Sequence, residues 1–201
     1  MILVNMAEEP DNYDSKVRSP GKVYLDSLPS LISVDFTNRE YWRRAIPDLR
    51  KAYNSICAYT CHWIALDTGG NSADHFLPKM MSPMLAYEWK NLRYVCSRLN
   101  ARKGTKTVID PFEVQPGMFE LRFPNLYVVV GDAFLENPLV RNTIVVLNLN
   151  DDIVVDSREE YVSLYASGKA DIAYLAERAP FIYQEIIRMG IEREDLVKMK
   201  F

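Results

Sequence analysis

The spacing of hydrophobic positions predicts a helix in the N-terminal part of the chain. Apolar residues recur at helical spacing over residues 38–56, directly after Thr37 and Glu40, which have the spacing of a capping box. We expect this helix to kink at Pro47, because proline removes an internal hydrogen bond. Over residues 1–36, prolines and a glycine break any long periodicity, so an irregular N-terminal arm is expected there.

The middle of the chain predicts a hairpin, a loop and a helix. Two short segments that favour β-structure flank the sequence Thr-Gly-Gly-Asn at 68–71, which is typical of a hairpin turn and would place His75 on or just after the second strand. Prolines then indicate a loop. Apolar residues return at helical spacing over 88–103, until Gly104 favours a helix end. The predicted order is strand, strand, loop, helix.

The C-terminal part alternates between strand-like and helical patterns. The runs MFELRF, LYVVVGD and TIVVLNLN are rich in β-branched and aromatic residues and predict three strands. Ser157 and Glu160 have capping-box spacing and predict the start of a helix of about ten residues. A longer helix is expected over 171–189, interrupted or bent around Pro180.

These patterns together predict an α+β protein. We expect residues 1–201 to form a single compact unit, made of the irregular arm over 1–36, a core with its preceding helix over 37–110, and β-strands followed by two helices over 111–201. The 48 % of hydrophobic and 11 % of aromatic residues are enough for such a core. The last segment carries no chemical motif of its own, so we expect it to serve in specificity or in docking a partner.

The N-terminal sequence and the cysteines bear on the compartment. The opening MILVNMAEEP has too short an apolar run, and acidic residues too early, for a signal peptide, and no run approaches the roughly 18 apolar residues of a membrane helix. Three cysteines argue against a disulfide framework and leave either reduced thiols or a partial metal site. We therefore expect a cytoplasmic protein that does not associate with a membrane.

Charge is unevenly distributed along the chain. The formal net charge is −3, yet residues 75–109 contain seven basic residues and one acidic residue. A basic segment within an acidic chain fits a surface that faces phosphate groups. From charge alone, a solvated helix face explains the segment equally well.

Four polar residues in and near this segment suit the hydrolysis of a phosphodiester. That reaction needs an activated water and charge stabilisation at the phosphate, which a neutral imidazole and one divalent ion with oxygen ligands can supply. Asp74 and His75 are adjacent, so their side chains can serve one site only at a strand end or a bulge. Asn91 and Asn100 would lie on different faces of one helix, so both can be ligands only if Asn91 precedes the regular helix.

The sequences ADHFLPK, AYEWKNLRYVC and LNARKG, in this order, resemble the HNH family of nucleases. They contain an Asp-His pair, a central Asn-Leu, and a terminal asparagine followed by Lys-Gly. Asparagine in place of a terminal histidine makes this an H-N-N variant. The resemblance covers roughly residues 56–110. It implies a ββα-metal core, here with an N-terminal helix and a C-terminal strand-plus-helix extension.

The resemblance also implies a role for each matched residue. His75 corresponds to the general base that deprotonates water, and Asn91 to the residue that holds the His75 ring through a hydrogen bond and a backbone-positioning role. Asp74 and Asn100 correspond to ligands of a divalent ion, Mg²⁺ or Mn²⁺, because such hard ions take oxygen ligands. The basic residues expected to contact the nucleic-acid backbone are Lys79, Arg102 and Lys103.

A structural zinc, which many relatives carry between two Cys-x-x-Cys pairs, is not expected in this chain. The first pair would be Cys57 and Cys61, which stand one residue too far apart. In the second, Cys96 is followed by Leu99 where a cysteine would be required. Even with His62 as a substitute ligand the arrangement is irregular, so buried free thiols are the favoured interpretation.

Three functions are compatible with these residues. The leading hypothesis is a metal-dependent endonuclease acting on DNA, in anti-phage defence or restriction and beside a protein partner such as an ATPase, as the resemblance implies. The main alternative is a non-catalytic or partner-activated nucleic-acid-binding module that retains the fold. In the third, Asp74 and His75 only stabilise a structural domain. Local roles also stay open for two asparagines, with Asn91 capping the start of a helix and Asn100 its end.

Overall fold

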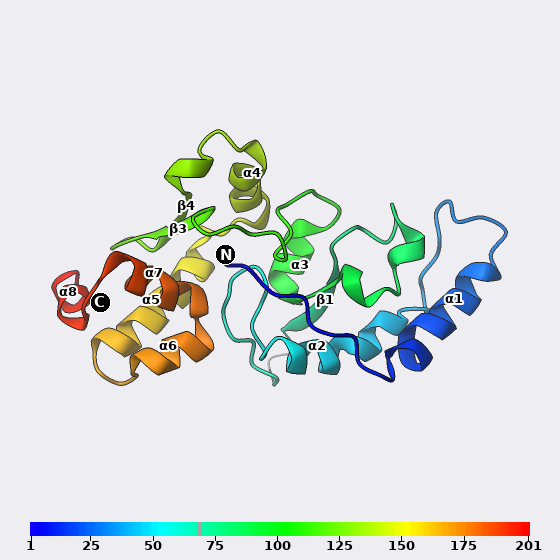
Figure 1. Ribbon diagram of the computed structural model, residues 1–201, viewed down its shortest axis with the longest axis horizontal. Helices are drawn as coiled ribbons and strands as arrows, with labels where there is room; N and C mark the ends of the chain where they lie inside the picture. The colour runs from blue at the N-terminus through cyan, green and yellow to red at the C-terminus, as the bar shows by residue number, and fades with distance from the viewer. Residues whose placement is uncertain (68–69) are drawn as a thin grey trace. The chain divides into compact units, whose positions relative to one another are not determined.

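The computed structural model describes residues 1–67 and 70–201 and divides into two compact units (Figure 1). The first unit contains residues 1–4, 56–63 and 106–201, and the second contains residues 5–55 and 64–105. Helices and two small two-stranded antiparallel sheets make up the regular structure of the described residues. The predicted α+β class is confirmed. That residues 1–201 form a single compact unit stays a prediction.

A small sheet and several helices form the first unit. β3 (Phe119–Arg122) and β4 (Tyr127–Val130) pair antiparallel, which confirms two of the predicted strands. The helices are α4 (Pro138–Leu147), α5 (Asp152–Ala166), α6 (Ile172–Arg178), α7 (Pro180–Met189) and α8 (Arg193–Lys198), with a 3₁₀ turn at Asp132–Phe134.

The third predicted strand, TIVVLNLN, is wrong, because this segment forms the second half of α4 and the loop after it. The Asn137 side chain caps the helix by accepting hydrogen bonds from the Leu139 and Val140 amides, and proline suits the first helical position. Val140, Thr143 and Leu147 are buried at helical spacing. Capping and burial therefore outweigh the β-branched composition of the segment.

The two remaining helical predictions for this unit are partly right. α5 begins at Asp152 rather than at Ser157, and the Ser157 hydroxyl is 3.2 Å from His62 Nδ1 instead of capping a helix. The interruption at Pro180 is confirmed, because α6 ends at Arg178 and proline opens α7.

The second unit has helices where an irregular arm is predicted. Residues 14–18 form a π-helical turn that continues into α1 (Ser19–Asp26). Pro20 is the second residue of α1, which follows the π-helical turn directly. The prediction of an irregular arm over 1–36 is therefore wrong for residues 14–26.

The helix predicted over 38–56 is shorter than expected. A 3₁₀ segment (Tyr41–Ala45) leads into α2 (Ile46–Ala52), and Pro47 lies in the first turn of α2 instead of at a kink. The expected capping box is not formed, because Glu40 directly precedes the 3₁₀ segment and makes no side-chain cap.

Around the candidate residues the order is strand, loop, strand, helix. β1 (Asn71–His75) pairs antiparallel with β2 (Leu92–Cys96), and α3 (Ser97–Lys103) follows directly. The predicted hairpin turn at 68–71 is wrong where it can be described, since Asn71 already lies in β1 opposite Cys96; Thr68 and Gly69 lie outside the described residues. The long loop between the strands contains 3₁₀ turns at Pro83–Leu85 and Trp89–Asn91.

The helix predicted over 88–103 is wrong for its first half, because β2 occupies that part. Leu92, Arg93, Tyr94 and Val95 are consecutive and all buried. A strand that is buried on both faces shows no alternation, so its apolar residues can match helical spacing by chance. Only the second half is helical, ending at Gly104 with a φ of 52°.

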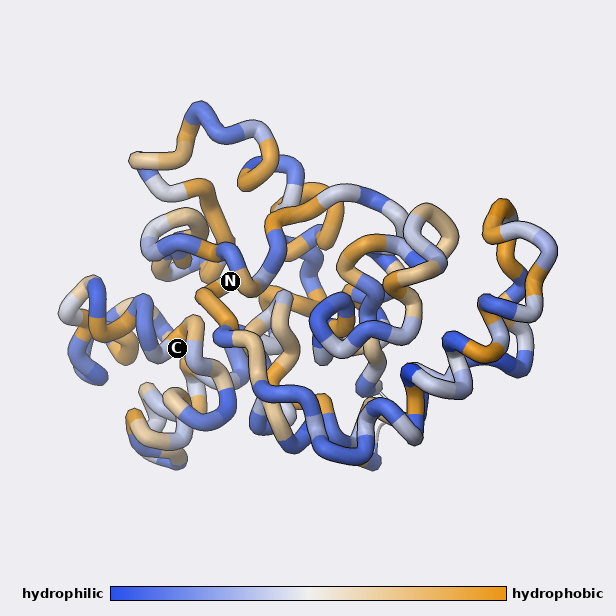
Figure 2. Tube along the Cα trace, turned by 45° about the vertical axis from the view of Figure 1, so that its right-hand side comes forward, coloured by the Kyte–Doolittle hydropathy of each residue, from blue (hydrophilic) through white to orange (hydrophobic). Residues whose placement is uncertain are grey.

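Hydrophobic and hydrophilic residues alternate in short stretches along the chain (Figure 2). Among the helices of the described residues, none combines the length and the apolar character needed to cross a membrane.

Candidate functional site

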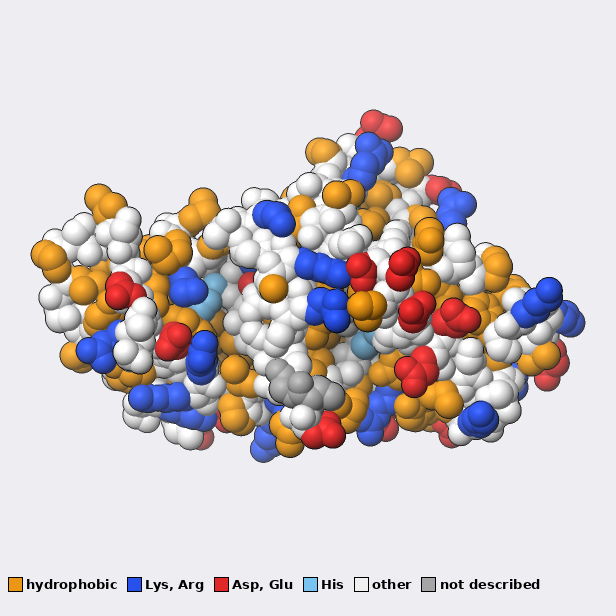
Figure 3. Space-filling model, turned by 180° about the vertical axis from the view of Figure 1, so that it is seen from behind, with side chains coloured by type: hydrophobic (Ala, Val, Ile, Leu, Met, Phe, Trp, Pro, Cys, Tyr) orange, Lys and Arg blue, Asp and Glu red, His pale blue; other side chains and the backbone are white. Residues whose placement is uncertain are grey.

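A cavity of about 860 Å³ in the second unit brings several candidate residues together. Its wall comes from three parts of the unit, residues 34–46, 71–80 and 97–105. The sequence-predicted residues that line it are Asp74, His75, Lys79 and Asn100. Acidic and basic side chains both contribute to the wall, and on the molecular face in Figure 3 the two signs are likewise interspersed.

His75 is the last residue of β1, which is the strand-end position that allows Asp74 and His75 to serve one cavity. Its Nε2 lies 2.9 Å from the Ala86 carbonyl oxygen. Because a carbonyl can only accept, Nε2 carries the hydrogen and Nδ1 of the neutral ring has a free lone pair.

The electrostatic surroundings keep the His75 ring neutral. The pKa of His75 is lowered to about 4, chiefly by burial; the bond to the Ala86 carbonyl opposes this shift, and the positive charges of Lys79 and Lys103 add to it. The indole of Trp42 stands edge-on to the ring, with 4.6 Å between the ring centroids. At neutral pH the site therefore holds an uncharged, sterically confined imidazole.

Asp74 is held in a buried ion pair. Lys103 Nζ lies 3.0 Å from Asp74 Oδ1 and 2.9 Å from the His75 carbonyl oxygen, and the two paired side chains are 0 % and 3 % exposed. Asp74 thus has a positively charged neighbour at the position where the resemblance implies a metal ligand. The lysine also ties the end of α3 to the end of β1.

Asn100 reaches the cavity from the middle of α3. Its Nδ2 donates to the Ser72 hydroxyl at 2.6 Å, which fixes the orientation of the amide. Because the amide nitrogen is used in this bond, the oxygen Oδ1 is the atom of Asn100 that could bind a metal ion. Ser72 lies two positions before Asp74, so both side chains project from the same face of β1.

Asn91 has a different role from the ring contact that the resemblance implies. Its Oδ1 accepts from the Leu77 amide at 2.8 Å, and its Nδ2 donates to the carbonyls of Leu77 and Leu85 at 3.0 and 3.1 Å. The predicted hydrogen bond to the His75 ring is wrong, because Ala86 makes that contact. The predicted backbone-positioning role does agree with these bonds, which close the loop between β1 and β2.

Only some basic side chains of residues 75–109 are exposed at the surface. Lys103 is fully buried and Arg93 is 3 % exposed, so the prediction that Lys103 contacts a nucleic-acid backbone is wrong. Lys79 lines the cavity, with its ammonium 5.2 Å from the centre of the Trp42 ring. Arg102 is half-buried on the last turn of α3, and a role at the nucleic-acid backbone stays a prediction for it.

Sequence reasoning misses four contributors to the site. These are Arg43, which lines the cavity with a 70 % exposed side chain, the Ala86 carbonyl, Trp42 and Ser72. Ser72 had a usable signal, because alternate residues of a strand share a face. Trp42 and Arg43 belong to the 3₁₀ segment before α2, and Ala86 to the loop between β1 and β2, so only the tertiary fold brings these three to the site.

The three cysteines lie outside any disulfide, and two of them, Cys57 and Cys61, are buried in the first unit. Among the described residues, no group of three or more His, Cys, Asp or Glu side chains is arranged to hold a metal ion. A divalent ion near Asp74 would therefore take most of its ligands from water and phosphate.

No known protein-family model matches the sequence, and no curated protein is significantly similar to it. The function of the protein is therefore inferred from the cavity and from the residues that line it.

Proposed function

We propose that this protein is a metal-dependent endonuclease of the HNH type, with β1, β2 and α3 as its ββα-metal core, and that it hydrolyses phosphodiester bonds in DNA. The observation that carries the proposal is the His75 ring. Its Nε2 is bound to the Ala86 carbonyl, and it lines one cavity with Asp74 and Asn100. Metal-assisted hydrolysis of a phosphodiester needs a positioned neutral base beside oxygen atoms that can bind a divalent ion.

The donor set fits one divalent ion, Mg²⁺ or Mn²⁺, held by Asp74 and Asn100. Both contribute oxygen atoms, and both line the cavity. The ion pair with Lys103 reduces the negative charge available at Asp74, which favours weak, millimolar-range binding over a tightly held ion. When bound, such an ion supplies positive charge at the scissile phosphate and at the leaving oxygen.

His75 supplies the proton transfer. Its Nδ1 takes a proton from a water molecule as the water oxygen forms a bond to phosphorus, and the bond from phosphorus to the leaving oxygen breaks. The leaving oxygen takes a proton from solvent, and His75 later returns its own proton to solvent. A ring with its pKa lowered to about 4 is a weak base, but a bound phosphodiester brings negative charge that raises the pKa again.

Lys79 and Arg43 are the basic residues best placed to hold the phosphate backbone. Both line the cavity, and the Arg43 side chain is largely exposed. Their charges are partly balanced by Asp35 and Glu40 on the same wall. We therefore expect modest affinity with a shallow dependence on salt, since few phosphates are neutralised. An ATPase partner and a role in anti-phage defence or restriction rest on the resemblance alone.

The second candidate function is a nucleic-acid-binding module without its own activity. The buried pair of Asp74 and Lys103 favours it, because an aspartate that is neutralised by a lysine is a weaker metal ligand. In this case the fold would be retained and cleavage would be absent or would depend on a partner.

Supercoiled plasmid incubated with Mg²⁺, Mn²⁺ or EDTA distinguishes the two functions. Nicking that requires a divalent ion and is lost in Asn100→Ala supports the enzyme. Retarded migration of the plasmid without nicking, in every ion condition, supports the binding module and contradicts catalysis by the isolated chain.

A further inference from the structure

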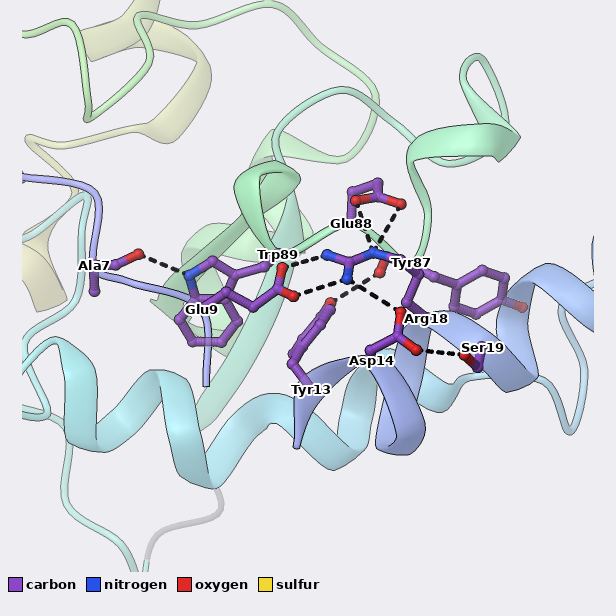
Figure 4. Close-up of polar contacts among 9 residues, drawn as sticks. All are labelled: Ala7, Glu9, Tyr13, Asp14, Arg18, Ser19, Tyr87, Glu88 and Trp89. Atoms are coloured by element: carbon purple, nitrogen blue, oxygen red, sulfur yellow. Dashed lines mark hydrogen bonds and ion pairs between the residues drawn. The ribbon is translucent and has the colours of Figure 1, made fainter. Parts of the chain in front are cut away.

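The segment Ala86–Trp89, whose first carbonyl binds the His75 ring, is held by residues 7–18, which are called the N-terminal arm from here on (Figure 4). The Tyr13 hydroxyl donates to the Tyr87 carbonyl at 3.1 Å, and the Trp89 indole donates to the Ala7 carbonyl at 2.9 Å. The Tyr13 and Trp89 rings meet edge to face at 5.3 Å. Tyr13, Tyr87 and Trp89 are all buried, so these contacts are shielded from water.

An ion pair adds a second connection between the same two parts. Arg18 Nε lies 3.2 and 3.1 Å from the two carboxylate oxygens of Glu88. The other guanidinium nitrogens bind Glu9 and Asp14, and these bonds fix the orientation of the guanidinium group that contacts Glu88 (Figure 4). An arginine held by several carboxylates is a more rigid connection than a single surface ion pair.

The Tyr87 ring connects the same segment to Trp42, the second group that contacts the His75 ring. It packs so closely on α1 that a Cβ at Gly21 would lie 2.2 Å from the ring. Its centroid is 5.7 Å from that of Trp42, which in turn stands edge-on to His75. The Ala86 carbonyl and Trp42, the two groups that confine the His75 ring, are thus both connected to the segment that the arm holds.

We propose that Tyr13 and the Arg18–Glu88 pair are positioning residues for His75: they fix Ala86–Trp89 so that the Ala86 carbonyl selects the ring form with hydrogen on Nε2. This inference rests on the proposed function and adds the N-terminal arm to the parts of the protein that position the His75 ring. Tyr13, Arg18 and Glu88 do not belong to the cavity wall, so they act through Ala86 and not on the substrate.

The variants that test this are Tyr13→Phe and Glu88→Gln. The first removes one hydroxyl and keeps the ring on Trp89, and the second removes one charge and keeps the side-chain shape. Asp48→Asn is the matched control. It breaks the 2.6 Å pair of Lys16 and Asp48, which also ties the arm to the unit and has similar exposure, 29 % and 26 % against 27 % for both Arg18 and Glu88.

Nitrogen-15 NMR of the imidazoles reads the ring form directly. The chain has two histidines, so His62 is an internal reference in the other unit. We expect His75 of the wild type to carry its hydrogen on Nε2. In both variants the Nδ1–H form should make up a larger share of the neutral ring than in the wild type. Asp48→Asn should leave the His75 shifts as in the wild type, and the His62 shifts should stay constant in all proteins.

Plasmid cleavage by the same folded proteins gives the second readout. Tyr13→Phe and Glu88→Gln should lower kcat roughly three- to tenfold, the range expected for losing one hydrogen bond, with KM within roughly twofold of the wild type. Wild-type His75 shifts in both variants would overturn the proposal, whether or not kcat falls. If the wild type cuts no nucleic acid, the proposed function fails, and the NMR shifts still decide whether the arm positions the ring.

Discussion

The Lys103 ammonium lies 3.0 Å from a carboxylate oxygen of Asp74, and both side chains are buried. The same ammonium binds the His75 carbonyl at 2.9 Å. One lysine from α3 therefore holds the two residues at the end of β1 on which the proposed chemistry depends, and it binds the carboxylate that the resemblance implies as a metal ligand.

Replacing Lys103 by methionine should strongly destabilise the protein. The buried Asp74 carboxyl group would lose the ammonium that it binds, so we expect the free energy of unfolding to fall by about 3–5 kcal/mol. Urea denaturation measures the change. The double variant Asp74→Asn/Lys103→Met removes both charges and should recover part of the loss. A single variant within about 1 kcal/mol of the wild type contradicts a structural role for the pair.

Asn91→Ala should affect both stability and cleavage. It leaves the Leu77 amide and two carbonyls of the loop without their partner, at an expected cost of about 2–3 kcal/mol. Asn150 is a control, because in the first unit it makes to Val128 the same two bonds that Asn91 makes to Leu77; only the bond from Asn91 to Leu85 has no counterpart. Asn150→Ala should lose comparable stability and keep the cleavage rate of the folded protein. Equal losses of cleavage in both variants would refute a specific role for Asn91.

His62 should make the protein less stable in acid. Burial, followed by the charges of Arg158 and the amino terminus, lowers the pKa of His62 from 6.5 to about 3. Unfolding therefore takes up a proton below pH 6.5, so the contribution of the neutral ring is complete above that pH and is lost as the pH falls towards about 3. The slope is about 1.4 kcal/mol per pH unit within this window.

Denaturation curves of the wild type and His62→Gln between pH 6 and pH 4 measure this contribution. His75 titrates in both proteins and cancels in the comparison. We expect a smaller loss of stability on acidification in His62→Gln, and identical slopes would show that His62 is not buried as a neutral ring.

Gly21→Ala should disturb the packing of α1 on Tyr87. The added Cβ would lie 2.2 Å from the ring, so the helix or the ring must move, at a typical cost of about 1–3 kcal/mol. Val23→Ala on the same helix changes a 70 % exposed side chain and should stay within about 0.5 kcal/mol of the wild type. Thermal denaturation of the two variants tests this, and equal midpoints would argue against close packing at Gly21.

The sequence locates the site better than it predicts the local structure around it. Asp74, His75 and Asn100 were expected in one place and do line one cavity, because a strand end and the following helix bring them there. The strand β2 was missed because it is buried on both faces and shows no alternation.

Two further errors come from interactions between distant residues. Lys103 looks like a surface lysine in the sequence, and only its pairing with Asp74 explains its burial. The partner of the His75 ring is the backbone carbonyl of Ala86, and a backbone group leaves no trace in residue types. Side-chain motifs therefore identified the reactive residues, while the residues that orient them required the tertiary structure.

The central claim is that His75 acts as a base in phosphodiester hydrolysis, and the initial rate of plasmid nicking in Mg²⁺ tests it most directly. The comparison is His75→Gln against His62→Gln, since these are the two histidines of the chain, both buried, and His75 alone lines the cavity. We predict a rate at least about 100-fold below the wild type for His75→Gln, as expected for a lost general base, and a near wild-type rate for folded His62→Gln. Undiminished nicking by His75→Gln would contradict the account.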